Sequence, residues 1–152
     1  MKKILVYLAG GMKSSWQDKV MEELDDLARE QIVEFFDPRN NPPEPEKYRA
    51  ADKEAWEKAD IIFAYAESSN PALFAMCIEL TGGFYKGAWT IFVDDLQPES
   101  MPTPEKSEEE RKRKKYLSFV ETVSHKKATS LAEGISILRD AIYERILHNY
   151  KP

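Results

Sequence analysis

The chain has 152 residues, which is long enough for one domain with a sizeable core. A hydrophobic fraction of 42% and a charged fraction of 32% exclude a largely disordered chain, and a net charge of −5 gives no basic surface for a nucleic-acid polymer. The single cysteine, Cys77, excludes an internal disulfide and a cysteine-based metal site. No apolar run reaches membrane-spanning length. We therefore expect a cytoplasmic protein without metal or cofactor and without a membrane partner.

Short apolar runs predict buried β-strands along the first two thirds of the chain. Four of them are nearly continuous rather than alternating, as strands covered on both faces should be: Ile4–Leu8, Ile32–Phe36, Ile61–Ala66 and Trp89–Val93. A fifth, shorter strand is predicted at Phe119–Val123.

Helical patterns occupy the segments between these runs. Ser14 with Gln17 predicts a capping box at the start of the first helix. Its buried stripe has four members: Trp16, Val20, Leu24 and Leu27. A second helix is predicted over Tyr48–Lys58, and a third begins near Phe74 and ends near Gly82 or Gly83. Ser130 with Glu133 predicts the cap of the last helix, whose apolar stripe is Leu131, Ile135, Leu138, Ile142 and Ile146.

The alternation of strands and helices predicts an α/β fold with a parallel sheet between two helical layers. We expect one domain over residues 1–152, with a charged insertion at about 95–116. There, Asp95–Pro104 is rich in proline, Ser107 is a helix cap, and three acid–base pairs follow at i,i+4: Glu108–Lys112, Glu109–Arg113 and Glu110–Lys114. These pairs favour a solvated helix over a nucleic-acid-binding run at Arg111–Lys115.

Parallel sheets bind ligands beyond the carboxyl ends of their strands, so the loops after the strands are the candidate site. Gly10-Gly11-Met12 follows the first strand and either approaches a ligand or forms a plain turn; Met12 and Trp16 are counted with the substrate-binding candidates. Asp37 and Arg39 follow the second strand. They either hold sugar hydroxyls and a phosphate or carboxylate, or make ordinary turn hydrogen bonds.

Two acidic residues stand out in the helices flanking the third strand. Asp52 and Trp56 share a helix face and would suit a planar base, unless Trp56 simply belongs to the core and Asp52 to the solvent. Glu79 is the only charged residue between Glu67 and Lys86. Because burying a carboxylate costs several kcal/mol unless it is paired or protonated, Glu79 is either a reactive carboxylate or a partner in a structural hydrogen bond.

Taken together, these segments resemble the nucleoside 2-deoxyribosyltransferase family and its nucleotide N-hydrolase relatives. The resemblance spans nearly the whole chain and is carried by the order and spacing of short motifs. These are Tyr7-Leu-Ala-Gly-Gly-Met, Phe36-Asp-Pro-Arg, Asp52 eight residues before Asp60, Ala59-Asp60-Ile-Ile-Phe-Ala-Tyr, Glu79-Leu80 with Lys86-Gly87, and Ser130-Leu-Ala-Glu-Gly-Ile.

The resemblance implies a flavodoxin-like, Rossmann-like five-stranded sheet and a nucleophile, Glu79, that attacks the anomeric carbon of deoxyribose. It further implies that Asp52 contacts the base and that Tyr7 orients Glu79. The chain departs from the family pattern at Leu73, where relatives often carry a polar residue six positions before the glutamate. Ser68, Ser69 and Asn70 are the possible substitutes.

The expected activity is cleavage or transfer at the N-glycosidic bond of a nucleoside, with a free base as second substrate. The alternative enzyme is a hydrolase of 2′-deoxynucleoside 5′-monophosphates, whose phosphate would need Gly10, Gly11, Lys13, Ser14 or Arg39. A third alternative is a nucleotide-sensing module without turnover. The resemblance also implies a homo-oligomer in which a neighbouring copy completes the pocket, and our candidates for that role are Tyr116 and Asn149.

Overall fold

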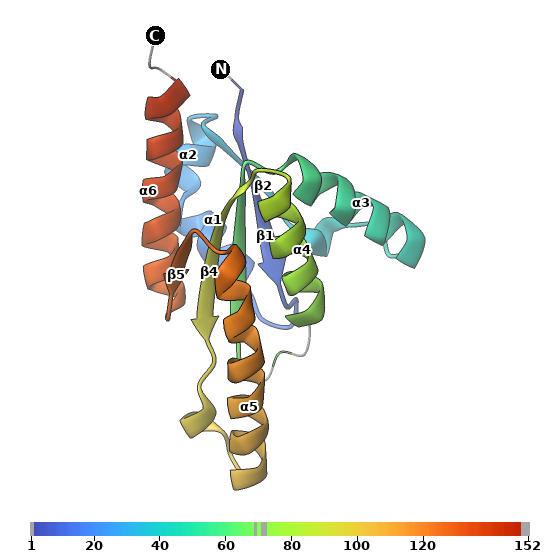
Figure 1. Ribbon diagram of the computed structural model, residues 1–152. Coiled ribbons are helices and arrows are strands. Elements are labelled where there is room, and N and C mark those ends of the chain that lie inside the picture. Colours follow the sequence, from blue (N-terminus) through green and yellow to red (C-terminus); the bar gives the residue numbers. More distant parts are fainter. Residues whose placement is uncertain (1, 69, 71–72, 150–152) are drawn as a thin grey trace.

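The computed structural model describes residues 2–68, 70 and 73–149, and its centre is a single parallel sheet (Figure 1). The strands lie in the order β2-β1-β3-β4-β5. Their bounds are β1 (Ile4–Gly10), β2 (Val33–Phe36), β3 (Ile61–Glu67), β4 (Trp89–Asp95) and β5 (Lys126–Ala128). The four continuous apolar runs are thus confirmed as strands, and the expected α/β architecture is confirmed with them.

Helices cover both faces of the sheet and complete three layers. Side chains alternate along β1, so that Val6 and Leu8 face one core while Tyr7 and Ala9 face the other. The first core is closed by α1 (Trp16–Glu23), α2 (Asp25–Arg29) and α6 (Leu131–Asn149). The second is closed by α3 (Pro45–Lys58), α4 (Leu73–Tyr85), the end of α5 (Pro104–Leu117) and the 3-10 helix η3 (Ser118–Val123).

The strand order puts the topological switch point, the expected ligand crevice of such a sheet, between β1 and β3. In a sheet ordered 2-1-3-4-5, the crossovers on either side of β1 leave in opposite directions, which opens a gap at the carboxyl ends of the strands. Two short 3-10 helices lie beyond those ends, η1 (Pro38–Asn40) after β2 and η2 (Pro98–Ser100) after β4. In Figure 1 the arrow of β4 points to the end of the molecule from which α5 projects. The charged insertion is therefore at the end of the molecule where the expected ligand site lies.

The predicted strand at Phe119–Val123 is wrong, because this segment is the 3-10 helix η3. Its buried residues, Val120 and Val123, are three positions apart, while Phe119 is exposed. The fifth strand is β5, which carries only one buried residue, Ala128, after two exposed lysines. Such an edge strand has too little apolar pattern to be recognised from sequence.

The caps predicted for three helices agree with the structure in one case and differ from it in two. The predicted cap at Ser130 is confirmed, because its hydroxyl accepts from the Glu133 amide at 3.2 Å, while the Glu133 side chain accepts from the Thr129 amide at 3.0 Å. Ser14 does not cap α1; Ser15 is at that position, and Ser14 donates instead to Glu67. Ser107 does not cap α5 either. The cap is Thr103, four residues earlier, whose hydroxyl accepts from the Lys106 amide at 3.2 Å.

The charged helix α5 is only partly the solvated helix that its charge pattern predicts. Glu108 and Lys112 pair at 4.0 Å as expected. Glu110, however, is buried and pairs with Arg113 at 2.7 Å, and Lys114 reaches across to Asp94 at 3.2 Å. One face of α5 is therefore packed against the rest of the molecule. No described helix has the length and apolarity needed to cross a membrane.

Candidate active site

The Glu79 carboxyl group is held in an apolar environment at the middle of α4. The described part of the helix, from Leu73 on, buries Leu73, Met76 and Leu80 against the sheet. Glu79 is on the same face and only 7% exposed. Burial raises the pKa of Glu79 to about 8, with the nearby Asp52 carboxylate adding to the rise and the Tyr7 hydroxyl opposing it. Near neutral pH this carboxyl group therefore retains a proton.

Tyr7 approaches Glu79 from the centre of the sheet. It is fully buried on β1, and its ring stacks on Phe36 of β2 with centroids 5.1 Å apart. Its hydroxyl has no hydrogen-bond partner of good geometry among the described residues, yet Glu79 and Asp52 lie close enough to raise the Tyr7 pKa beyond the effect of burial. Burying a hydroxyl without a partner costs free energy. The position of the Tyr7 hydroxyl near two carboxyl groups therefore favours a functional role over a structural one.

Asp52 completes the group from α3. It is half-buried, and burial raises its pKa, while the Asn41 amide that donates to it and the nearby Tyr7 hydroxyl oppose the rise. The Asn41 amide donates to Asp52 at 2.6 Å and so fixes the orientation of the carboxylate. Three side chains from three elements thus converge, as the resemblance implies: Tyr7, Asp52 and Glu79.

Two further residues at this site were not predicted from the sequence. Asn41 lies just past the Asp37-Pro-Arg motif, in a segment that gives no signal of contact with α3. Tyr48 lies one helical turn before Asp52, and this i,i+4 spacing was the available clue. Its hydroxyl contacts the Met12 sulfur at 3.3 Å, and burial, then Asp52 and Glu79, raise the Tyr48 pKa to about 12.

Trp56 sets the close approach of α3 to α4. An ideal Cβ on Gly82 would lie 2.6 Å from the Trp56 ring, so only glycine fits there. Trp56 is half-buried in the core on this face of the sheet. The structure therefore gives Trp56 a packing role, and the residue one turn before it, Asp52, is brought toward the face of α4 that carries Glu79.

The Gly10-Gly11 turn lies against the segment that follows β3. An ideal Cβ on Gly11 would lie within 2.0 Å of three Asn70 side-chain atoms, so Asn70 packs directly on the turn. Asn70 is buried and donates to Glu67 at 3.2 Å, and Glu67 also accepts from the Ser14 hydroxyl at 2.5 Å. These contacts connect the loop after β1 with the segment after β3. Ser69 lies outside the described residues.

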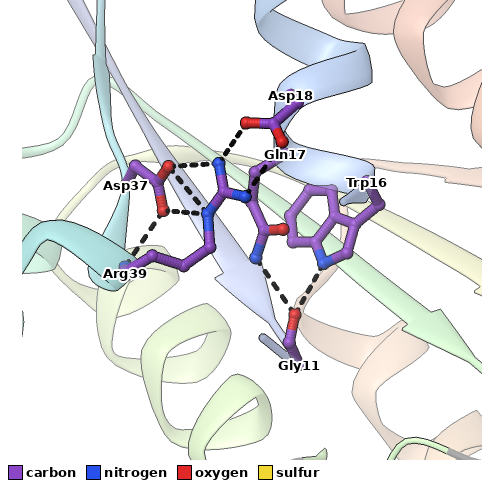
Figure 2. A network of polar contacts seen from close by, with 6 residues as sticks. All are labelled: Gly11, Trp16, Gln17, Asp18, Asp37 and Arg39. Atoms are coloured by element: carbon purple, nitrogen blue, oxygen red, sulfur yellow. Dashed lines mark hydrogen bonds and ion pairs between the residues drawn. The ribbon is translucent and has the colours of Figure 1, made fainter. Parts of the chain in front are cut away.

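The other side of the turn is fixed by buried polar contacts (Figure 2). The Gly11 carbonyl accepts from the Trp16 indole at 2.8 Å and from the Gln17 amide at 3.0 Å. Trp16 is 4% exposed and packs on Phe63 and Tyr65. The structure thus places Trp16 in the core behind the turn, away from the substrate position expected for it.

Asp37 and Arg39 form an ion pair with each other, so their charged groups are already engaged within the protein (Figure 2). The Arg39 guanidinium donates to both oxygens of Asp37, the closest at 2.6 Å, and to both oxygens of Asp18, the closest at 2.5 Å. Asp37 also accepts from the Arg39 amide and so caps η1. Because two carboxylates surround this one guanidinium, the turn interpretation of both residues fits the structure better than sugar or phosphate binding.

The remaining candidates lie around this centre. Met12 is 45% exposed at the mouth of the turn, beside Tyr48. Leu73 is buried and lines a cavity of about 300 Å³ with Phe74, Cys77, Arg113, Tyr116 and Leu117. Burial raises the pKa of the Cys77 thiol, which suits a packing residue. Tyr116 is exposed, and the side chain of Asn149 lies outside the described residues. Among the described residues no three His, Cys, Asp or Glu side chains form a metal-binding group.

Comparison with known proteins supports the fold. No family model matches the chain, and no curated protein matches it. A solved structure described as a conserved protein from Enterococcus faecalis V583 superimposes with a TM-score of 0.61 at 12% sequence identity. The match covers 94% of this chain and 99% of that chain, so the three-layer α/β architecture is shared over the whole domain.

Proposed function

We propose that this protein cleaves or transfers the N-glycosidic bond of a 2′-deoxynucleoside, with Glu79 as the nucleophile. The observation that carries the proposal is a carboxyl group buried to 7% exposure beside an unpartnered tyrosine hydroxyl and a second carboxyl group. A structural carboxylate would have a cation or several donors around it. The resemblance to nucleoside 2-deoxyribosyltransferases supports the same assignment.

In the first step the Glu79 carboxylate attacks the anomeric carbon of the sugar. A carbon–oxygen bond forms while the carbon–nitrogen bond breaks, and its electron pair leaves with the base. Asp52, protonated, gives its proton to the departing base. In the second step, water or a second base attacks the same carbon and releases Glu79. Asp52 takes up the proton that the attacking group loses, so that configuration is retained and the site is restored.

Tyr7 connects the two carboxyl groups. The raised pKa values of Glu79 and Asp52 mean that the pair retains one proton near neutral pH. Reaction requires this proton on Asp52 and the charge on Glu79. The Tyr7 hydroxyl, which is close to both groups, accepts a proton from Glu79 while it donates its own proton to Asp52. The proton thus passes from Glu79 to Asp52 without a water molecule. The Tyr7 hydroxyl also donates to the ionised Glu79 and holds it in orientation.

An uncharged nucleoside fits the site better than a nucleoside monophosphate. Arg39 is occupied by Asp18 and Asp37, Ser14 donates to Glu67, and Glu67 adds a negative charge at the end of β3. Lys13 is an exposed cation of this region and lines a cavity together with Lys106, Arg113 and two glutamates, Glu109 and Glu110. The N-hydrolase alternative would therefore depend on Lys13 and on backbone amides of the turn.

The test is a substrate panel followed by chromatography. The protein is incubated with 2′-deoxynucleosides and with their 5′-monophosphates, each with and without a second free base. Base exchange identifies a transferase, and free base without exchange identifies a hydrolase. Ligand binding by the folded protein with no product in any reaction would reject turnover and leave the sensing module.

We further propose that the protein is a homo-oligomer, as the resemblance implies. Several of its exposed large hydrophobic residues lie on α4, α5 and η3: Phe74, Ile78, Tyr85, Tyr116 and Phe119. Such a group favours contact with another protein surface. Light scattering coupled to size-exclusion chromatography should give a mass of at least two chains, and the double substitution Phe74→Ser with Ile78→Ser should shift it toward one.

A further inference from the structure

The charged insertion contains a partly buried ion pair that contacts the segment after β3. Glu110 on α5 is 3% exposed and accepts from Arg113 at 2.7 Å. The other end of the Arg113 guanidinium donates to the backbone carbonyl of Asn70. Arg113 therefore bridges α5 and the segment between β3 and α4, two parts of the chain that are 43 residues apart.

From Asn70 the contacts continue to the turn after β1. The Asn70 side chain donates to Glu67, Glu67 accepts from Ser14, and Asn70 packs on Gly11 without space for a Cβ between them. Five residues from four segments thus form one chain of contacts, which passes through the backbone of Asn70: Glu110, Arg113, Asn70, Glu67 and Ser14. Its far end is the Gly10-Gly11 turn at the mouth of the crevice.

We propose that Arg113 is a positioning residue: by holding the Asn70 carbonyl, it fixes Asn70 against Gly11 and keeps both loops in the geometry that binds substrate. A guanidinium suits this task because its planar fork serves a carboxylate and a carbonyl at the same time. The kinetic consequence rests on the proposed function, whereas the ordering of the Asn70 segment does not.

The pair offers a way to separate positioning from stability. In Arg113→Met, Glu110 is left as a buried carboxylate without its cation, so the whole domain loses stability. In the double variant Glu110→Met with Arg113→Met, two apolar side chains of similar volume replace the pair, and stability returns close to that of the wild type. The hydrogen bond to Asn70 is absent from both variants. Arg111→Met is the matched control, because Arg111 lies on the exposed side of α5 and pairs with Glu99.

Two measurements on the double variant test the proposal. Hydrogen exchange in peptides that contain Asn70 should accelerate about tenfold or more, as expected when a hydrogen bond from a charged donor is lost. For the nucleoside reaction, KM should rise by about the same factor while kcat changes less, and Arg113→Lys should recover part of the loss. Arg111→Met should match the wild type in both.

The outcomes are distinct. Wild-type exchange and wild-type KM in the double variant would overturn the proposal, because Arg113 would then serve stability alone. Accelerated exchange with unchanged KM would overturn its role in substrate binding. If the wild type turns over no nucleoside, the proposed function fails, and the exchange rates still decide whether Arg113 orders the loop.

Discussion

The ionisation of Glu79 makes the stability of the protein depend on pH in a way that one substitution should remove. Its pKa is about 8 in the folded protein against 4.5 for an ordinary glutamate. The folded state therefore holds a proton that the unfolded state has already lost between these values. This contribution to stability is fully present below pH 4.5 and is lost as the pH rises through about 8. The slope approaches about 1.4 kcal/mol per pH unit, or roughly 4 kcal/mol from pH 5 to pH 8.

Glu79→Gln removes the titrating group and should flatten this dependence. The measurement is urea unfolding of the wild type and the variant at half-unit steps from pH 5 to pH 8.5. We expect the variant to become the more stable of the two as the pH increases, because an amide has no charge to bury. Glu34→Gln, at an exposed position on β2, is the matched control and should follow the wild type. Parallel curves for the wild type and Glu79→Gln would refute the buried, protonated carboxyl group.

Three further substitutions test the arrangement around Glu79. Asp52→Asn should lower kcat by about a hundredfold or more. It should also remove the fall in kcat/KM that we expect above pH 8, so a falling limb that persists in the variant would contradict the shared proton. Tyr7→Phe should lower turnover while leaving the free energy of unfolding equal or higher, because the lost hydroxyl is buried without a partner; a destabilised variant would show that the hydroxyl is structural. Gly82→Ala should cost about 1–3 kcal/mol and change the Trp56 fluorescence, because the new methyl group would lie 2.6 Å from the indole; unchanged stability and fluorescence would argue against that contact.

The central strands were predictable because each is an apolar run long enough to be buried on both faces. Ile4–Leu8 and Ile61–Ala66 fall within β1 and β3, whose carboxyl ends define the crevice. β5 was missed because its burial depends on one alanine at the edge of the sheet. η3 was mistaken for a strand, because a short run containing Phe119 and two valines fits either period until tertiary contacts choose between them.

The candidate site was predictable where a residue contradicts its local environment. Glu79 drew attention as a lone charge in an apolar helix, and the structure does bury it. Asp37 and Arg39 were ambiguous because a turn and a ligand site require the same polar residues, and only the pairing of Arg39 with both Asp37 and Asp18 separates the two interpretations. Arg113 gave no local signal at all. Its contact with Asn70 joins distant segments, and i,i+4 spacing assigned it to the wrong acid on its own helix.

The proposed role of Glu79 as nucleophile requires a covalent bond between its carboxylate and the sugar. The decisive measurement is intact-protein mass spectrometry after incubation with a 2′-deoxynucleoside whose sugar carries a 2-fluoro substituent, which slows release of the glycosyl group. We expect a mass increase equal to the sugar without its base, located on the peptide that contains Glu79 and absent from Glu79→Gln. Release of the base by Glu79→Gln at the wild-type rate, or an adduct on a different residue, would contradict the assignment of the nucleophile.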